Sequence, residues 1–286
     1  MANWTHLIRF VAREDHQEHL GQLVDTTRDV GLDSVAGHEI KAYLVRGTIF
    51  DGRIVPGVIL SLLSPISPHE CNYIRCIGLN YGAHAKEGGF ELPQAPVIFT
   101  KPRTALANPY PGAITIPKVA QDGTSDYEGE LCVVLGRAGR DIAEDAALDH
   151  VLGYTASNDV SARKLQLVTT QWSFGKGLDG SCPLGPVLVS QAAINDPQQL
   201  GTIRTEYNGR EVQRGHTSDM IFDVRRLVSY LSRGTTLEAG SIILTGTPAG
   251  IGFTRKPPVV LTDGDDIRVY IEGIGTLVNR VRYEED

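Results

Sequence analysis

Residues 122–136, with the sequence DGTSDYEGELCVVLG, place three carboxylates directly ahead of an apolar run. Asp126, Glu128 and Glu130 stand at alternate positions, and alternate side chains of a β-strand point to the same face. Residues 131–135 continue this strand with a composition typical of a buried core. Like charges repel, and burying them without partners is costly. The stretch therefore predicts a strand that enters a core with an acidic face in need of compensation.

Two interpretations of Glu128 and Glu130 stay open from the residues alone. One is an exposed, acidic start of a strand. The other is a site for a hard divalent cation such as Mg²⁺, which prefers oxygen ligands and would relieve the repulsion. Asp159, within GYTASNDVSARKLQ (153–166), follows a strand-like run and would supply a third ligand. An Asn-Asp pair also caps turns without any further role.

Three more polar residues follow closely along the chain. Arg163 and Gln166 are three positions apart and share a face if the segment is a helical turn. Lys176 lies between two glycines, where the backbone can approach a ligand closely. Each residue alone is compatible with a solvated loop. Together with the acidic residues they indicate a metal centre that binds an anion.

Composition and charge narrow the function classes. The 286 residues are 41% hydrophobic, enough for the core of one large domain or two modest ones. The net charge of −7, without a basic block, argues against a nucleic-acid partner. No apolar stretch approaches the roughly 20 residues that a membrane span needs. The first 20 residues lack a secretory pattern and carry early acidic residues, so we expect a cytoplasmic protein, with a mitochondrial location left open.

The cysteine pattern predicts no special chemistry. Four cysteines are present and none forms a CxxC pair. We expect reduced, mostly buried thiols.

The predicted organisation is mostly β (α+β). Residues 1–69 form a small β-rich unit, with strand-like runs at 5–12 and 41–50, and Pro65 and Pro68 mark its end. Residues 70–286 form a larger unit in which apolar runs of strand length alternate with turns rich in Gly and Pro. Two helices are predicted. One covers 141–153, and the other follows Asp223 as N-cap and ends before Gly234.

The motifs, taken in order, resemble the fumarylacetoacetate hydrolase family. They are CIGLNYGAHAKE (76–87), PVIFTKP (96–102), DYEGEL (126–131), GYTASNDVSAR (153–163), GKGLDGSCPLGP (175–186), TSDMIF (217–222) and TGTPAGIG (245–252). No single motif is specific, but the ordered set covers most of the chain. The resemblance implies a catalytic domain of rolled, mixed β-sheets with few helices, a small N-terminal domain and a homodimer.

The resemblance also implies roles for particular residues. Glu128, Glu130 and Asp159 match the positions that hold Mg²⁺, with Mn²⁺ or Ca²⁺ as substitutes. Such an ion keeps about three coordination positions open, and a 2-oxo acid or β-diketo acid can fill two of them as a chelate. Asp126 is not a family ligand and is expected to support the strand start. The family positions that contact substrate correspond to Arg163, Gln166, Lys176 and Thr247, and Lys176 is also expected to be catalytic, because it would hold the enolate that leaves.

A histidine–glutamate pair completes the expected site. His84 and Glu87 are three positions apart, so one helical turn places them on the same face. A histidine acts as a general base near neutral pH, and a carboxylate can orient it. Without the resemblance, a surface pair is the simpler interpretation. The family uses such a pair to activate water.

The sequence thus predicts a metal-dependent hydrolase that cleaves a carbon–carbon bond in an acylpyruvate or a similar β-diketo acid. The same site would also serve an oxaloacetate decarboxylase, or an isomerase or hydratase of an unsaturated 2-oxo diacid. A non-catalytic protein that binds a metal or ligand is the alternative from another class. Around Lys176 the run Gly-Lys-Gly-Leu-Asp departs from the sequence of many family members. The substrate of any one relative therefore cannot be assigned to this chain.

Overall fold

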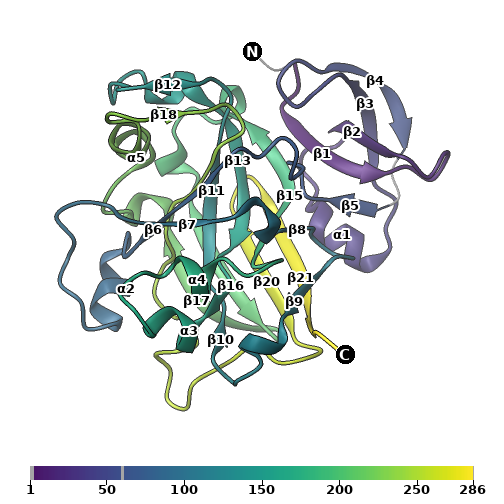
Figure 1. Ribbon diagram of the computed structural model, residues 1–286. Coiled ribbons are helices and arrows are strands. Elements are labelled where there is room, and N and C mark those ends of the chain that lie inside the picture. The colour runs from purple at the N-terminus through teal and green to yellow at the C-terminus, as the bar shows by residue number, and fades with distance from the viewer. Residues whose placement is uncertain (1–2, 59–60, 286) are drawn as a thin grey trace.

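The computed structural model describes residues 3–58 and 61–285 and shows a mostly β protein with few and short helices (Figure 1). This confirms the predicted fold class. The main sheet runs in the order β4 (Arg53–Val58), β3 (Lys41–Arg46), β2 (Glu18–Leu23), β1 (His6–Val11), β15 (Cys182–Ser190), β13 (Val151–Asn158), β11 (Gly129–Leu135), β19 (Ile242–Leu244), β6 (Ile74–Gly78) and β7 (Val97–Lys101). The short strands β5 (Ser61–Leu63) and β8 (Leu106–Ala107) pair with β1 and β15.

Strand β11 lies inside this sheet, between β13 and β19. Its residues alternate between two cores: Leu131, Val133 and Leu135 belong to one hydrophobic cluster, and Cys132 and Val134 to another. Because both faces of the strand are covered, every position from Leu131 to Leu135 is apolar and the usual alternation with polar residues is absent there. The apolar run at 131–135 is therefore explained by burial on both sides.

A second sheet packs across the first. Its order is β17 (Arg210–His216), β16 (Thr202–Tyr207), β20 (Asp266–Ile271), β21 (Gly275–Tyr283) and β9 (Ala113–Ile116). Ile203 and Val269 of this sheet share a hydrophobic cluster with Leu131 and Tyr154 of the main sheet. Two small ladders complete the β structure, β10 (Ser125–Asp126) with β14 (Ser161–Ala162) and β12 (Gly139–Arg140) with β18 (Thr236–Leu237). The two packed sheets form the scaffold on which the polar residues of interest stand.

The helices are α1 (Val30–Ala36), α2 (Gly82–Glu87), α3 (Arg163–Leu167), α4 (Ser173–Lys176) and α5 (Val224–Leu231). Helix α5 was predicted. Asp223 is its N-cap, where the side chain accepts a hydrogen bond of 2.8 Å from the backbone N–H of Arg226. The helix is longer than the others and buries its apolar stripe against the sheet. None of the described helices is long and apolar enough to cross a membrane.

The predicted helix over 141–153 is wrong. The segment holds only a 3₁₀ turn, Ala147–His150, and β13 begins at Val151. Asp141 has a φ of +51°, which an α-helix does not permit. Val151 and Gly153 pair with β11. This strand pairing outweighs the local helical propensity on which the prediction of a helix rested.

The N-terminal residues join the main sheet through β1. His6 and Leu7 pair with Val189 and Leu188 of β15, so β1 to β4 continue the sheet outward (upper right in Figure 1). The expected strands at 5–12 and 41–50 correspond to β1 and β3. The division of the chain into domains at residue 69 stays a prediction.

Candidate active site

Strand pairing brings the acidic residues together. In the antiparallel pair of β11 and β13, Gly129 lies opposite Asn158 and Glu130 opposite Ser157. The start of β11 therefore adjoins the end of β13, and Asp159 comes next to Glu128. The backbone confirms this, because the N–H of Asp159 donates to the carbonyl of Glu128 at 2.8 Å.

The expected continuous strand from Asp126 to Glu130 is interrupted. Strand β10 ends at Asp126 and β11 begins at Gly129, with Glu128 in the connection. The backbone N–H of Glu128 donates to the side chain of Asn158 instead of to a ladder partner. The break directs the Asp126 carboxylate toward Arg163, so only two of the three alternating carboxylates face the centre of the cluster.

Glu128, Glu130 and Asp159 form a compact acidic triad. Each offers a carboxylate oxygen, and these oxygens all lie within 4.8 Å of one another. All three side chains are buried. Such a set of hard oxygen donors matches the preference of a divalent cation.

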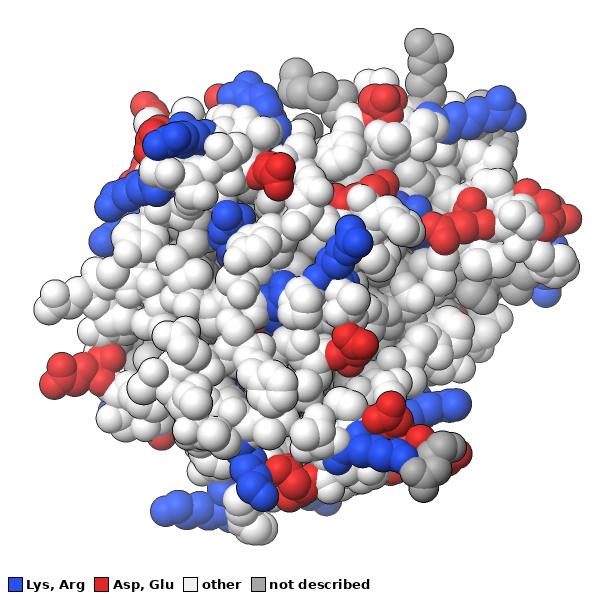
Figure 2. Space-filling model, viewed as in Figure 1, with Lys and Arg blue, Asp and Glu red and all other residues white. Residues whose placement is uncertain are grey.

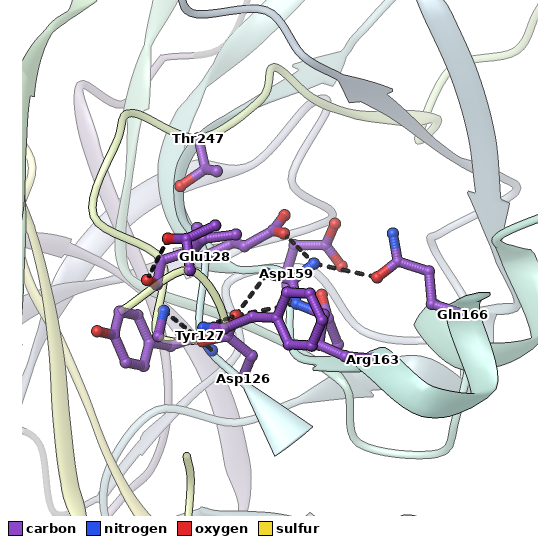
Figure 3. Close-up of polar contacts among 12 residues, drawn as sticks. Asp126, Tyr127, Glu128, Asp159, Arg163, Gln166 and Thr247 are labelled. Carbon is purple, nitrogen blue, oxygen red and sulfur yellow. Dashed lines mark hydrogen bonds and ion pairs between the residues drawn. The ribbon is translucent and has the colours of Figure 1, made fainter. Parts of the chain in front are cut away.

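Two ammonium groups and one guanidinium surround the triad. Lys176 Nζ donates to Glu128 Oε2 at 2.6 Å and to Asp159 Oδ2 at 2.8 Å. Lys101 Nζ lies 2.7 Å from the other oxygen of Asp159. Arg163 Nη1 lies 2.7 Å from Glu128 Oε1 (Figure 3). These three cations neutralise most of the charge, but not that of Glu130.

Glu130 has no cationic partner among the residues that the structure describes. Its Oε2 accepts one hydrogen bond, 2.8 Å long, from the backbone N–H of Gly246. Burial raises the pKa of Glu130 well above its ordinary value, and the negative charges of Asp159 and Glu128 raise it further. Burial would also raise the pKa of Glu128, yet Lys176 and Arg163 outweigh it and lower this pKa to about 2. The uncompensated charge at Glu130 thus fits a divalent cation bound by the triad.

His84 and Glu87 lie on helix α2, as expected. His84 Nδ1 is 3.5 Å from Glu87 Oε2, an ion-pair distance that is long for a hydrogen bond. The same carboxylate accepts the backbone N–H of Gly250 at 2.8 Å and the hydroxyl of Thr254. Burial would raise the pKa of Glu87, but these donors and His84 outweigh it and lower the pKa. The Glu87 carboxylate therefore stays ionised near neutral pH.

A cavity of about 210 Å³ lies between His84 of this pair and Glu128 of the triad. His84, Glu128, Arg163 and Lys176 all line it. It lies in the part of the fold where α2, α3 and α4 gather beside the main sheet (lower left in Figure 1). The structure therefore brings the predicted base, His84, to the same cavity as Glu128, one of the three predicted metal ligands.

The two other predicted contact residues, Gln166 and Thr247, also line this cavity. Gln166 Oε1 accepts a hydrogen bond from Arg163 at 3.0 Å. The Thr247 hydroxyl donates to the carbonyl of Gly129 at 3.0 Å and accepts from Gln213 at 2.7 Å. The hydroxyl proton of Thr247 is therefore already donated within the protein. If this hydroxyl contacts the substrate, it would accept a hydrogen bond from it. The site roles of these residues, like those of the triad and the His84–Glu87 pair, stay predictions.

Asp126 anchors the arginine. Its carboxylate accepts Arg163 Nε at 2.9 Å and Nη2 at 2.7 Å, and also the backbone N–H groups of Gly252 and Phe253 (Figure 3). The carboxylate is fully buried, so each of these donors depends on it. Asp126 thus links Arg163 to the loop of residues 250–254.

Asp126→Asn is expected to lower the free energy of unfolding by about 3 kcal/mol. This is the lower end for breaking a buried ion pair, because Glu128 still partners Arg163. Urea denaturation measures the change, with Asp15→Asn as the control. Asp15 is exposed and bonds His19, so its replacement should matter little. An unchanged midpoint for Asp126→Asn would contradict this anchoring role.

The sequence reasoning missed Lys101. Its side chain is fully buried and donates to the carbonyls of Ser181 at 2.9 Å and Val160 at 3.3 Å, besides its ion pair with Asp159. The signal was present in PVIFTKP, where a lysine ends an apolar strand and a buried lysine needs a charged partner.

The four cysteines are free and buried, as predicted, and burial raises the pKa of Cys182 to about 11.

Comparison with known proteins identifies the family. Residues 73–282 match the family described as fumarylacetoacetate (FAA) hydrolase, C-terminal. The chain is 44% identical over 294 residues to caffeoylpyruvate hydrolase of Neonothopanus nambi, covering 99% of this chain and 95% of that one. It is 46% identical over 226 residues to the oxaloacetate tautomerase YisK of Bacillus subtilis, covering 78% and 73%.

A solved structure with a similar fold carries a metal. It is fumarylpyruvate hydrolase from Pseudomonas aeruginosa in complex with Mn²⁺ and pyruvate, with a TM-score of 0.66, 33% identity, and coverage of 75% of this chain and 91% of that one. The resemblance inferred from the ordered motifs is thereby confirmed. The chain belongs to the fumarylacetoacetate hydrolase family.

Proposed function

We propose that this chain is a metal-dependent hydrolase that cleaves the carbon–carbon bond of an acylpyruvate. The observation that carries the proposal is the cavity that His84 and Glu128 both line, because His84 pairs with Glu87 and Glu128 belongs to the acidic triad. The family and its hydrolase members confirm the prediction of an enzyme that acts on 2-oxo or β-diketo acids. The buried triad, and the Mn²⁺ in a similar structure, support a divalent cation as the cofactor.

The reaction converts an acylpyruvate and water into a carboxylic acid and pyruvate. The water oxygen bonds to the acyl carbon, and the bond from this carbon to the neighbouring methylene breaks. The electron pair of that bond passes to the enolate of pyruvate, and a proton then reaches the methylene carbon. A divalent cation held by Glu128, Glu130 and Asp159 would supply Lewis-acid stabilisation of the negative charge.

The side chains of this protein provide the other functions. His84 Nδ1 faces Glu87, which leaves Nε2 to take a proton from water, and the ionised carboxylate stabilises the imidazolium that results. Lys176 and Arg163 bring positive charge to the cavity, where a substrate carboxylate and the enolate oxygen need it. The proton on His84 Nε2 is then available for the methylene carbon.

A second candidate is tautomerisation of oxaloacetate. The 46% identity to an oxaloacetate tautomerase supports it. This reaction needs only a proton removed from one atom and returned to another, so the same histidine would serve without any attack by water. Decarboxylation of oxaloacetate is a further outcome that the same experiment detects.

Pyruvate release tests the proposal. Acetylpyruvate and oxaloacetate are each supplied with Mg²⁺ and then with a chelator, and pyruvate is followed through coupled reduction to lactate. Cation-dependent release from acetylpyruvate is the expected result. Release from oxaloacetate alone would replace hydrolysis with decarboxylation. Enol–keto interconversion of oxaloacetate without pyruvate would favour the tautomerase.

We further propose Mg²⁺ as the resident ion, a homodimer as the assembly and the cytoplasm as the location. The all-oxygen donor set supports Mg²⁺, although Mn²⁺ accepts the same ligands. The dimer and the location rest on the family resemblance and on the sequence. Light scattering of the purified protein tests the assembly.

A further inference from the structure

We infer that the substrate carries a flat, uncharged acyl group that contains an aromatic ring. The inference rests on the proposed function and concerns the apolar part of the lining of the same cavity. There the wall is made of aromatic and aliphatic side chains, namely Phe90, Phe99, Leu167, Trp172, Ile251 and Phe253. Acetyl and carboxymethyl groups would leave most of this wall without a partner.

The apolar wall begins directly beside the charged end of the cavity. Lys176 Nζ lies over the ring of Phe99, 4.9 Å from its centroid. The ring of Trp172 packs against Phe99, with centroids 5.8 Å apart and planes inclined at 59°. A 2-oxo acid held at Lys176 and Arg163 would therefore direct its acyl group onto this pair of rings.

Glycines make room for two of the aromatic rings. A Cβ at Gly78 would lie 2.5 Å from the Trp172 ring, and a Cβ at Gly88 would lie 2.6 Å from the Phe90 ring. Both distances are too short for a side chain with a Cβ at Gly78 or Gly88, so the two rings lie directly against the backbone at these glycines. The chain thus provides specific space for bulky flat side chains at the wall.

The size of the cavity suits a ring. Its volume of about 210 Å³ exceeds the roughly 150 Å³ of an apolar cavity that binds benzene in another protein. Rings that meet in tilted or offset geometry gain energy beyond the burial of their area. A substrate with an aromatic acyl group would therefore gain more binding free energy from this wall than a substrate with an acetyl group.

The charges of the site disfavour a second carboxylate on the substrate. The described residues hold four buried carboxylates and three buried cations in this cluster: Asp126, Glu128, Glu130 and Asp159 against Lys101, Arg163 and Lys176. A divalent cation would leave one positive charge in excess within this cluster, and the ionised Glu87 beside His84 adds one negative charge next to it. A second carboxylate, as in oxaloacetate, would have to lie against the aromatic wall and lose its hydration without compensation.

The mouth of the cavity is apolar as well. Phe90 is 56% exposed and Phe253 is 44% exposed, although both line the cavity. The surface over α2, α3 and α4 shows few charged side chains (lower left in Figure 2). Apolar side chains gathered around an opening favour the entry of an apolar group.

The test compares kcat/KM for benzoylpyruvate, acetylpyruvate and oxaloacetate, with pyruvate as the common product. The wild-type enzyme is expected to prefer benzoylpyruvate over acetylpyruvate by about tenfold or more. Trp172→Ala and Phe253→Ala should each lower this benzoyl-to-acetyl ratio severalfold. Phe253 is partly exposed, so its truncation leaves no buried void and keeps the test valid if the Trp172 variant folds poorly. Val168→Ala is the matched control, because Val168 is 71% exposed and does not line the cavity.

The outcomes separate this inference from the proposed function. A benzoyl preference that falls in both aromatic variants and persists in Val168→Ala supports the inference. Faster turnover of acetylpyruvate or oxaloacetate, or a ratio unchanged by both variants, overturns it while cleavage itself stands. If no acylpyruvate releases pyruvate, the proposed function fails and the inference fails with it.

Discussion

Replacing His84 with alanine is expected to lower kcat for acylpyruvate cleavage by about 10²- to 10⁴-fold, the range for loss of a general base. The imidazole lines the cavity and faces Glu87, and no other histidine among the described residues lines it. Divalent-cation binding should be retained, because His84 is not among the three proposed ligands. Steady-state kinetics measure the loss, and calorimetric titration with Mn²⁺ measures cation affinity.

His69→Ala is the control for this substitution. His69 is exposed on the segment between β5 and β6 and does not line the cavity, so its removal should leave kcat unchanged. Wild-type turnover in the His84 variant would remove this histidine from the role of base. Loss of cation binding together with turnover would instead assign it to the metal centre.

Glu130→Gln is expected to weaken divalent-cation binding by more than 100-fold and to abolish cation-dependent turnover. Losing a residue that only supports a metal ligand costs about 10- to 100-fold in affinity, and a direct ligand should cost more. Glutamine keeps the shape of the side chain and can still accept the hydrogen bond from Gly246. Titration calorimetry on the folded variant measures the change.

The same substitution should stabilise the protein when no metal is present, and the gain should depend on pH. Burial raises the pKa of Glu130 in the folded state, so the unfolded chain releases this proton first as the pH rises. Below the unfolded pKa, near 4.3, the variant and the wild type should have equal stability. Above it, the wild type loses stability until the folded pKa is passed. Unfolding in metal-free buffer at several pH values measures the difference, and a gain that is largest at acid pH would contradict the direction of the shift.

Glu128→Gln is a less clear test of the metal site than Glu130→Gln, although the sequence predicts both glutamates as metal ligands. Glu128 is bonded to Lys176 and Arg163, both buried, while Glu130 has only a backbone donor. Removing the Glu128 charge would leave two buried cations with fewer partners and would destabilise the fold. The two glutamates of one motif therefore differ in what their loss would cost.

The sequence indicated which residues meet at the candidate site better than it predicted the local backbone. The motifs place the acidic residues at strand ends, and the antiparallel register of β11 and β13 brings these ends together. The strand break at Tyr127 and Glu128 was not visible, because it depends on a bond between Glu128 and Asn158, residues 30 positions apart. The segment 141–153 was mistaken for a helix for the same reason, since pairing with β11 outweighs its local propensity.

Lys101 and Asp126 show a second limit of sequence reasoning. Both were visible in quoted motifs, yet their contribution follows from contacts made across the fold. Lys101 reaches Asp159 and Arg163 reaches Asp126 only after the sheets have packed. A pattern of residue types identifies charged groups, but which charge neutralises which is set by tertiary structure.

The hydrogen bonds from Gly250 and Thr254 to Glu87 connect the proposed base, His84, with the loop of residues 250–254. The loop that supplies these donors also supplies Ile251 and Phe253 to the apolar wall. A substrate that packs against Phe253, as proposed, would therefore steady the same loop that contacts Glu87 on the helix of His84. Binding energy from the acyl group would then help to position the base during the reaction. A substrate that lacks this group would therefore be turned over with a lower kcat and would not only bind more weakly.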